Sequence, residues 1–254
     1  MKTFYFTATG NCLYAAKQIG GTIISIPRVL KQGITSFEDE KIAIVVPCYY
    51  FGTPRIVQKF LQTVRLKAPY IAAVMSYGNF MAAGIHDLGK HAERNGIALS
   101  YSKSILMTDN YLPLFRVEDQ LKLETSKKIP ENLGKIADDI KNSSKMIEKI
   151  SAPSKIFSSI FQFFYRKSWG KKDRNFWIDE NCNGCKICEQ VCPVDNIKVE
   201  KKPIYHHDCE ECLGCIHLCP QNAIHLKKER GSGRFRNSNV TVKEIIDSNT
   251  GVPG

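Results

Sequence analysis

Cysteine is nearly absent from the first 180 residues of this 254-residue chain, which contain only Cys12 and Cys48. Long apolar runs are also missing: no stretch is long enough to span a bilayer, and the opening MKTFYFTATG has no apolar signal core or small-residue cleavage site. These absences favour a cytoplasmic protein and argue against a secreted disulfide scaffold. The other eight cysteines crowd into residues 182–219, which indicates a metal site.

The first 120 residues alternate between short β-rich apolar runs and helical patterns, as βαβ units do. Runs such as IAIVV are apolar throughout, which is typical of parallel strands covered on both faces. Residues 127–149, with Ile136, Ile140 and Ile147 in helical spacing, predict the last helix of this part. We therefore expect an α/β fold with a doubly wound parallel sheet. Its five strands are expected at 3–7, 22–26, 42–46, 70–76 and 98–107.

Changes in composition divide the chain into four segments. The expected boundaries are 1–150 for the sheet domain, 151–175 for a basic aromatic linker, 176–228 for a cysteine domain and 229–254 for a tail. The tail, with GSGRFRNSNV and a closing GVPG, is expected to be poorly packed.

The linker 151–175 predicts an amphipathic helix. Its apolar face, at helical spacing, comprises Ile156, Phe157, Ile160, Phe161 and Phe164. A basic helix of this kind can lie on a membrane surface. The alternative is that the face packs against the sheet domain or the cysteine domain, which is the commoner use of such a stripe.

The stretch CNGCKICEQVCP, residues 182–193, has the form C-x2-C-x2-C-x3-C-P, and the same form recurs 27 positions later. The eight cysteines are Cys182, Cys185, Cys188, Cys192, Cys209, Cys212, Cys215 and Cys219. Three thiolates on one tight loop suit three corners of an iron–sulfur cube, whereas the fourth cysteine of such a run ligates the neighbouring cluster. The repeat, including Pro193 and Pro220, indicates a duplicated structural unit.

Residues 178–227 closely resemble the bacterial two-cluster ferredoxins, which are small α+β domains. The expected ligands of cluster one are Cys182, Cys185, Cys188 and Cys219, and those of cluster two are Cys209, Cys212, Cys215 and Cys192. Gly184 and Gly214 are expected to give the loops backbone freedom. The alternative, a pair of structural zinc sites, leaves the third cysteine and the C-P unexplained. His206, His207 and His217 are expected to be solvated or packing residues.

The stretch TATGNC, residues 7–12, follows the first expected strand and opens a helix. Such a loop can surround a phosphate with backbone N–H groups, hydroxyls and the positive end of the helix dipole. Its candidate binding residues are Thr7, Thr9, Gly10, Asn11 and Cys12. A reactive thiol at a helix N-terminus is conceivable for Cys12, but a simple substitution within the loop is the plainer interpretation.

The loop's position resembles the flavodoxin family, whose similar T-x-T-G-x-T loop holds the phosphate of FMN. The resemblance covers roughly 1–150 and implies a sheet of order 2-1-3-4-5 and an FMN site. Cys12 departs from the family, since a hydroxyl is usual there. Two further loops, after strands three and four, fall where the family binds the isoalloxazine ring. They offer Tyr50, Phe51, Gly52, Ser76, Tyr77, Gly78 and Asn79.

Together the two modules look like the flavodoxin-fused ferredoxins of anaerobic microbes, which implies an electron carrier that exchanges electrons with donor and acceptor proteins. The alternative is a flavoenzyme that reduces a small unsaturated acceptor, and a third class is a zinc-stabilised interaction module. The net charge of +11 falls to roughly 11 − 4 − 2 = +5 when two clusters and a phosphate are counted, so we expect no nucleic-acid partner. The direction of electron flow and the oligomeric state stay open.

Overall fold

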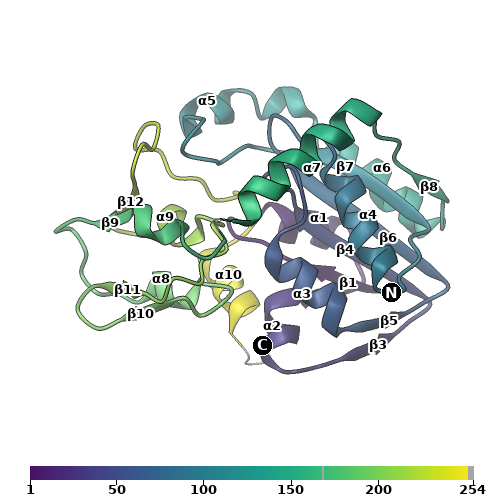
Figure 1. Cartoon of the computed structure of the whole chain (residues 1–254), viewed down its shortest axis with the longest axis horizontal. Helices are drawn as coiled ribbons and strands as arrows, with labels where there is room; N and C mark the ends of the chain where they lie inside the picture. Colours follow the sequence, from purple (N-terminus) through teal and green to yellow (C-terminus); the bar gives the residue numbers. More distant parts are fainter. Residues whose placement is uncertain (168, 251–254) are drawn as a thin grey trace.

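The chain forms a sheet domain and a smaller cysteine unit that lie side by side (Figure 1). This computed structural model describes residues 1–167 and 169–250. Within them, no helix is long and apolar enough to cross a membrane.

The sheet domain contains a parallel sheet of six strands in the order β2-β1-β4-β6-β7-β8. The strands are β1 Lys2–Tyr5, β2 Thr22–Ser25, β4 Lys41–Pro47, β6 Tyr70–Tyr77, β7 Tyr101–Leu106 and β8 Met146–Ile147. The prediction of an α/β fold around a parallel sheet is confirmed. The sixth strand was not expected: β8 is a two-residue edge strand that pairs with β7. A separate parallel pair is formed by β3 Ser36–Glu38 and β5 Arg65–Lys67.

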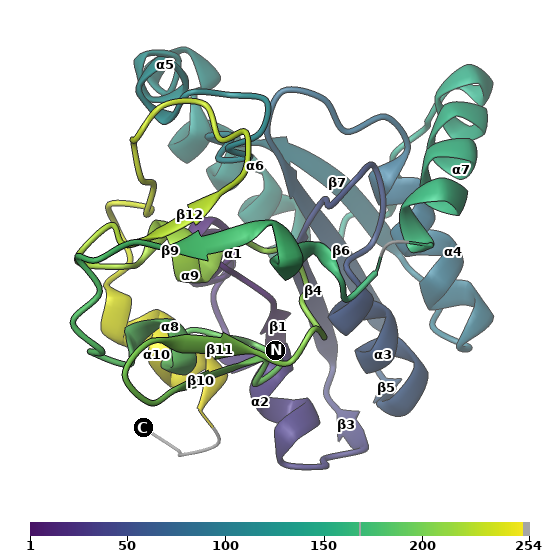
Figure 2. The same ribbon diagram turned by 60° about the vertical axis from the view of Figure 1, so that its left-hand side comes forward.

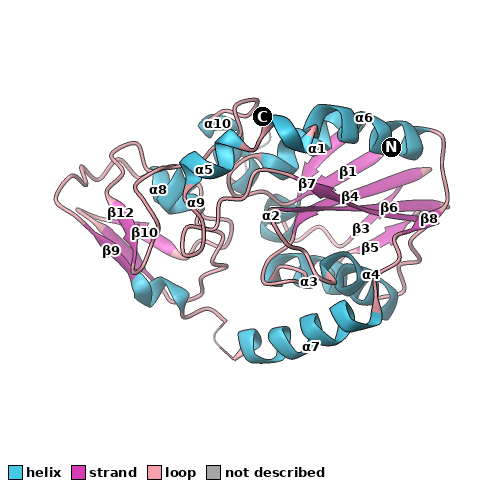
Figure 3. Cartoon of the chain, turned by 90° about the horizontal axis from the view of Figure 1, so that it is seen from above, coloured by secondary structure: helices cyan, strands magenta, loops and turns pink. Residues whose placement is uncertain are grey.

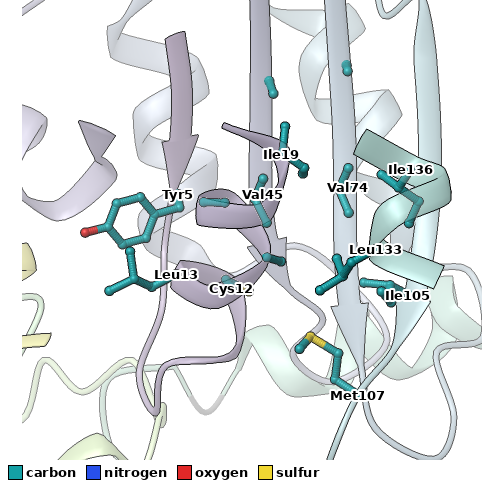
Figure 4. Packing of buried hydrophobic residues seen from close by; sticks show 14 of the residues in the cluster. Tyr5, Cys12, Leu13, Ile19, Val45, Val74, Ile105, Met107, Leu133 and Ile136 are labelled. Carbon is teal, nitrogen blue, oxygen red and sulfur yellow. The ribbon is translucent and has the colours of Figure 1, made fainter. Parts of the chain in front are cut away.

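Helices cover both faces of this sheet (Figure 3). The covering helices are α1 Asn11–Ile19 and α6 Ile129–Lys141 on one face, and α2 Ile26–Lys31, α3 Arg55–Thr63 and α4 Gly84–Arg94 on the other. Strand β4 shows why the run IAIVV is apolar throughout. Ala43 and Val45 face the core under α1 and α6, where Figure 4 shows Val45. Ile42 and Ile44 face the core under α2, α3 and α4.

The helix expected over 127–149 is shorter than predicted. Helix α6 ends at Lys141, and Ser143 adopts a left-handed φ of 55°, which breaks the helical path. Ile136 and Ile140 are buried as expected, but Ile147 lies exposed in β8. Two short helical elements precede α6: α5 Val117–Lys122 and the 3-10 turn η1 Thr125–Lys127.

Helix α7, Ala152–Arg166, is oriented with its apolar side outward. Its buried side chains are the polar Ser158 and Gln162. All five residues of the predicted apolar face are exposed. The face packs on the sheet domain only along one edge, where Phe157 and Phe161 contact Phe51. Ser158 and Gln162 explain the orientation, because both hydrogen-bond to backbone groups of the sheet domain: Ala83 N donates to Ser158 Oγ, and Gln162 Nε2 donates to the Tyr49 and Tyr50 carbonyls.

The cysteine unit contains the pattern strand, short helix, strand twice in succession. Its elements are η2 Lys172–Asn175, β9 Phe176–Ile178, α8 Ile187–Gln190, β10 Ile197–Val199, β11 Pro203–Tyr205, α9 Gly214–His217 and β12 Ile224–Leu226. Strand β9 pairs with β12, and β10 pairs with β11, both antiparallel. The unit lies beyond the carboxyl ends of β1 and β4, which run towards it in Figure 2.

The expectation of a poorly packed tail is wrong for residues 229–250, while the closing GVPG, 251–254, lies outside the described residues. Helix α10, Val242–Asn249, is capped by Thr241 and Glu244 in a complete capping box and buries Ile245. It docks between the two parts of the molecule: Tyr5 of the sheet domain shares a hydrogen bond with Ser248, and Asn249 Nδ2 donates to the Val191 carbonyl at 2.8 Å. The sequence misled because the packed residues are separated by polar ones.

Candidate functional site

The eight clustered cysteines gather around two cavities in the cysteine unit. One cavity is lined by Cys182, Cys185, Cys188 and Cys219, and the other by Cys192, Cys209, Cys212 and Cys215. The fourth cysteine of each motif therefore lies with the first three of the other motif. All ten cysteines of the chain are free thiols.

The two motifs repeat one backbone path. Left-handed residues recur 27 positions apart: Lys186 and Leu213, which begin α8 and α9, have φ of 65° and 57°. Gly184 is also left-handed, with φ of 72°, and Glu211 takes the same role in the second motif without being glycine. Gly214 is not left-handed. Its missing Cβ eases a close approach instead, since a Cβ there would lie 3.3 Å from the Ala8 carbonyl oxygen.

Backbone N–H groups point at sulfur in both motifs. Asn196 N donates to Cys192 Sγ at 3.2 Å, and Ala223 N, 27 positions later, donates to Cys219 Sγ at 3.3 Å. Such donors stabilise negative charge on thiolate ligands. Among the described residues, no three His, Cys, Asp or Glu side chains are close enough together to hold a single metal ion.

The loop 7–12 connects β1 to α1 and is buried where the cysteine unit and the tail meet the sheet domain. Its Gly10 has φ of 101° and is the N-cap of α1, with no side-chain cap on the helix. The first N–H groups of α1 therefore have no partner within the helix. Thr7 Oγ1 accepts from Gly10 N at 3.1 Å, which places a hydroxyl inside the turn.

Asparagines hold this loop in place. Asn110 Nδ2 donates to Thr9 Oγ1 at 2.7 Å, and Asn11 Nδ2 donates to the Thr108 carbonyl at 3.1 Å. From the tail, Asn237 N donates to the Thr9 carbonyl at 2.8 Å and its Nδ2 to Asn11 Oδ1 at 3.1 Å. Sequence reasoning left Asn110 out of the site and missed Asn237, because neither belongs to a motif.

The two remaining cysteines lie in surroundings that disfavour an ionised thiol. Cys12 points into the core beneath α1, with Sγ 3.1 Å from Ser76 Oγ, and burial raises the pKa of its thiol to about 12. Burial, with the charge of Asp87, likewise raises the pKa of Cys48 to about 12. The reactive role considered for Cys12 is therefore contradicted, since a thiol in a closed apolar site does not ionise near neutral pH.

The loop after β4 forms a tight turn that presents two aromatic residues. Tyr49 and Gly52 exchange backbone hydrogen bonds at 3.0 Å, and the two residues between them are left-handed. Tyr50 faces the cysteine unit: its hydroxyl lies 2.6 Å from the Tyr111 hydroxyl and donates to Glu211 Oε1. The Tyr50 ring also stacks on Tyr165 of α7, with ring centres 3.8 Å apart. Phe51 lies against α7 as well, and it contacts Phe80, Phe157 and Phe161.

The other candidate ring-binding residues have protein partners of their own. A Cβ on Gly52 would lie 2.5 Å from Gln162 Nε2, and one on Gly78 would overlap Asp109 Oδ2. Asn79 donates to the same Asp109 oxygen from its N at 2.9 Å and from its Nδ2 at 3.1 Å. Tyr77 packs against the core under α3 and α4. At both glycines the group that approaches closely is a protein side chain, Gln162 at Gly52 and Asp109 at Gly78.

Polar contacts fix the second cysteine motif against the sheet domain. Arg55 Nε donates to Glu210 Oε1 at 2.9 Å. His217 Nε2 donates to the Asn110 carbonyl at 2.8 Å, and its Nδ1 accepts from Phe235 N at 3.1 Å. His217 is therefore a buried packing residue, whereas His206 and His207 are exposed. The motif lies directly against the loop 7–12, since Gly214 contacts Ala8.

The donor sets match two kinds of ligand. Four thiols around each cavity, with backbone N–H groups directed at sulfur, suit a thiolate-bound cluster. The uncapped start of the nine-residue α1 leaves backbone N–H groups of the kind that bind phosphate, while the Thr7 and Thr9 hydroxyls already have protein partners in Gly10 N and Asn110 Nδ2. Of the predicted flavin-ring residues, only Tyr50 and Phe51 lie at the tip of a turn.

Comparison with known proteins supports the iron–sulfur assignment. The profile of the 4Fe-4S binding domain family matches residues 176–198, so a domain of this kind is present there. The chain is 38% identical to a subunit of the ion-translocating oxidoreductase complex of Methanosarcina acetivorans over 58 residues. These residues make up 22% of each of the two chains. Over 48 residues the chain is 40% identical to an uncharacterized protein of Methanocaldococcus jannaschii, 18% of this chain and 19% of that one. The chain thus spans about a fifth of the length of these relatives.

One of the solved structures found aligns with about half of the chain. It is the Trp repressor binding protein from Bacillus subtilis, which aligns with 53% of this chain and 98% of its own at 11% identity, with a TM-score of 0.29. A likeness at this score carries no argument about fold or function.

Proposed function

We propose that the chain is an electron-transfer protein that holds two [4Fe-4S] clusters and one FMN and passes electrons between them. The observation that carries the proposal is the contact between the second cysteine motif and the loop 7–12. Gly214, two residues after Cys212, lies against Ala8 of that loop. A metal centre and a phosphate-bearing cofactor bound at these places share one interface, which suits electron transfer.

Two clusters are proposed with crossed ligands. Cluster one takes Cys182, Cys185, Cys188 and Cys219, and cluster two takes Cys209, Cys212, Cys215 and Cys192. The cavity linings support this grouping, since each set of four lines one cavity. The family profile supports iron–sulfur chemistry for the first motif.

A flavodoxin-like FMN site is proposed at the carboxyl end of the sheet. The start of α1, with Thr7 and Thr9, would hold the phosphate, and the turn carrying Tyr50 and Phe51 would border the ring. FMN accepts one or two electrons, whereas each cluster passes one, so the chain would couple one-electron and two-electron partners. Cluster two is the nearer relay, because its loop borders the loop 7–12.

Anaerobic purification with counts of iron, sulfide and flavin tests this function. About eight irons and one flavin per chain are expected. The variant Cys192→Ala should reduce the count to about four irons and remove the second cluster, because Cys192 lies with Cys209, Cys212 and Cys215. Cys48→Ala, a buried non-ligand, is the control. Bound zinc without flavin, or an unchanged iron count in Cys192→Ala, contradicts the proposal.

A flavin-dependent reductase is the second candidate, favoured by one polar group beside the proposed ring site. The hydroxyls of Tyr50 and Tyr111 lie 2.6 Å apart, and Glu211 joins them through Oε1. The other carboxylate oxygen, Glu211 Oε2, is buried without a hydrogen-bond partner and lies 3.6 Å from Lys172 Nζ. Such groups could bind or protonate a small unsaturated acceptor.

Kinetics of the double variant Tyr50→Phe/Tyr111→Phe separate the two candidates. For a carrier, electron transfer to an artificial acceptor such as a viologen should stay within about twofold of the parent. For a reductase, turnover of a quinone or another unsaturated acceptor should fall by about 10²-fold or more, which is typical when a general acid is lost. Matching iron and flavin counts in both proteins provide the control.

A further inference from the structure

We propose that the outward side of α7 is a docking surface for an anionic lipid bilayer. The surface, called the α7 face, consists of Ile156, Phe157, Ile160, Phe161, Phe163 and Phe164. All six side chains are exposed, with Ile156 at 62%, Phe163 at 61% and Phe164 at 63% of full exposure. Such a row of large apolar side chains on one surface helix marks an interaction site.

The outward orientation is built into the fold. Ser158 accepts a hydrogen bond from Ala83 N, and Gln162 donates to the Tyr49 and Tyr50 carbonyls, so the polar side of the helix is held inward. Gly52 makes room for Gln162, since a Cβ there would lie 2.5 Å from its Nε2. Figures 2 and 3 show α7 on the outside of the molecule beside α4. Turning the α7 face inward would break these contacts.

The surface extends onto the neighbouring loop of the sheet domain. Phe80, also exposed at 61%, contacts Phe157 and Phe51. The apolar patch thus combines two elements that are far apart in sequence. It is broad enough to enter the interface of a bilayer with several side chains at once.

The basic residues around the α7 face favour an anionic membrane as its binding partner. Residues 149–172 contain no Asp or Glu, and their basic residues are Lys149, Lys155, Arg166, Lys167, Lys171 and Lys172. Lys167 Nζ lies 4.7 Å from the centre of the Phe163 ring, so a cation sits at the edge of the α7 face. Apolar side chains bordered by cations match anionic headgroups above acyl chains. A second copy of the chain fits poorly, since a symmetric contact would oppose these cations without an acidic partner on the helix.

Vesicle flotation with the cluster-loaded protein tests the proposal. We expect it to float with vesicles of phosphatidylcholine containing about 30% phosphatidylglycerol, and less with phosphatidylcholine alone. Phe163→Ser/Phe164→Ser should weaken binding at least about tenfold, because both rings are exposed and enter the interface. Lys155→Gln/Arg166→Gln/Lys167→Gln should weaken binding to the anionic vesicles by a similar factor and remove their advantage.

The matched control is Leu121→Ser/Leu123→Ser, which removes two exposed leucines on and just after α5, away from α7 (Figure 2). It should bind as the parent does, and all variants should keep the parent's iron and flavin counts. No flotation with anionic vesicles, or unchanged flotation of Phe163→Ser/Phe164→Ser, overturns the proposal. A lipid-free dimer that this double variant abolishes also overturns it, since a second copy would then cover the α7 face. These outcomes are independent of whether the chain carries electrons.

Discussion

The sheet domain and the cysteine unit are stabilised in different ways. The sheet domain buries two apolar cores, one on each face of a six-stranded sheet, and its central strands are fully enclosed. In the cysteine unit the strands are three residues long, and the apolar cluster includes the thiol residues Cys188, Cys192 and Cys215 around open cavities. Since apolar burial dominates the first region, we expect it to keep its fold without a bound group, and we expect the second to depend on what its thiols bind.

Removing iron should produce the largest difference between the two regions, measured as their sensitivity to proteases. After chelation under reducing conditions, we expect proteases to cut within residues 176–228 while the sheet domain survives, because the ligands supply much of the unit's folding free energy. Limited proteolysis followed by mass spectrometry measures this. Reconstitution with iron and sulfide should restore protection. Equal protection of the unit with and without iron would mean that its packing suffices by itself.

A core substitution in the sheet domain should lower the stability of that domain and leave the iron content of the cysteine unit unchanged. Phe60 of α3 is fully buried, so Phe60→Ala should lower the free energy of unfolding by about 3–5 kcal/mol. Urea denaturation followed by circular dichroism measures the loss, and the iron count without urea should not change. Phe80→Ala, at an exposed position, should stay within about 0.5 kcal/mol of the parent. A parallel loss of iron in Phe60→Ala would show that the two regions unfold as one.

The contact between the regions can be weakened at His217. His217→Ala removes its hydrogen bonds with the Asn110 carbonyl and Phe235 N, and leaves both groups buried. A cost of about 1–3 kcal/mol is expected. Hydrogen exchange at loop 7–12 and at residues 108–111 should rise accordingly. The exposed His206→Ala is the control, and unchanged exchange in His217→Ala would show that other contacts hold the regions together.

The smallest change in the free energy of unfolding is expected at α10, the helix that contacts both regions. The Lys17 ammonium, with the N–H of Thr241, lowers the pKa of Glu244 to about 2 from its ordinary value of 4.5. A carboxyl with a depressed folded pKa stabilises the protein above its unfolded pKa, and this contribution is lost as the pH falls from about 4.5 to about 2. Since the pair is partly exposed, Glu244→Gln should cost only about 0.5 kcal/mol at pH 7.

Urea titrations at pH 7 and pH 3 test whether the stabilisation by Glu244 decreases as the pH falls. The difference between parent and Glu244→Gln should shrink at pH 3, while Asp247→Asn, on the exposed side of the same helix, should show a smaller difference at both. A difference that grows at pH 3 would contradict the assigned cause.

Patterns of residues close together in sequence were reliable guides. The cysteine spacing predicted the 4Fe-4S binding domain, which the family profile confirms for residues 176–198. The apolar runs predicted the parallel sheet, because each strand carries its own burial pattern. The edge strand β8 escaped notice, since two exposed residues leave no such pattern. The FMN site and the second cluster stay predictions.

Contacts between distant segments were not readable from the sequence. Asn237 reaches the loop 7–12 from the tail, and Asp109 approaches Gly78, but neither residue stands in a recognisable motif. The orientation of α7 was also left open by the sequence. An apolar stripe indicates only that one side of a helix is hydrophobic. Which side faces the protein depends here on the hydrogen bonds of Ser158 and Gln162.

The sequence by itself determined the type of each region: a sheet covered on both faces and a repeated cysteine motif with fixed spacing. Both depend on the short-range geometry of strands, helices and loops. Tertiary structure alone decided that the second motif lies against the loop 7–12, that the tail locks this loop, and that α7 exposes its phenylalanines. These features depend on contacts between segments far apart in the chain, such as that of Asn237 with Asn11, and no local pattern encodes them.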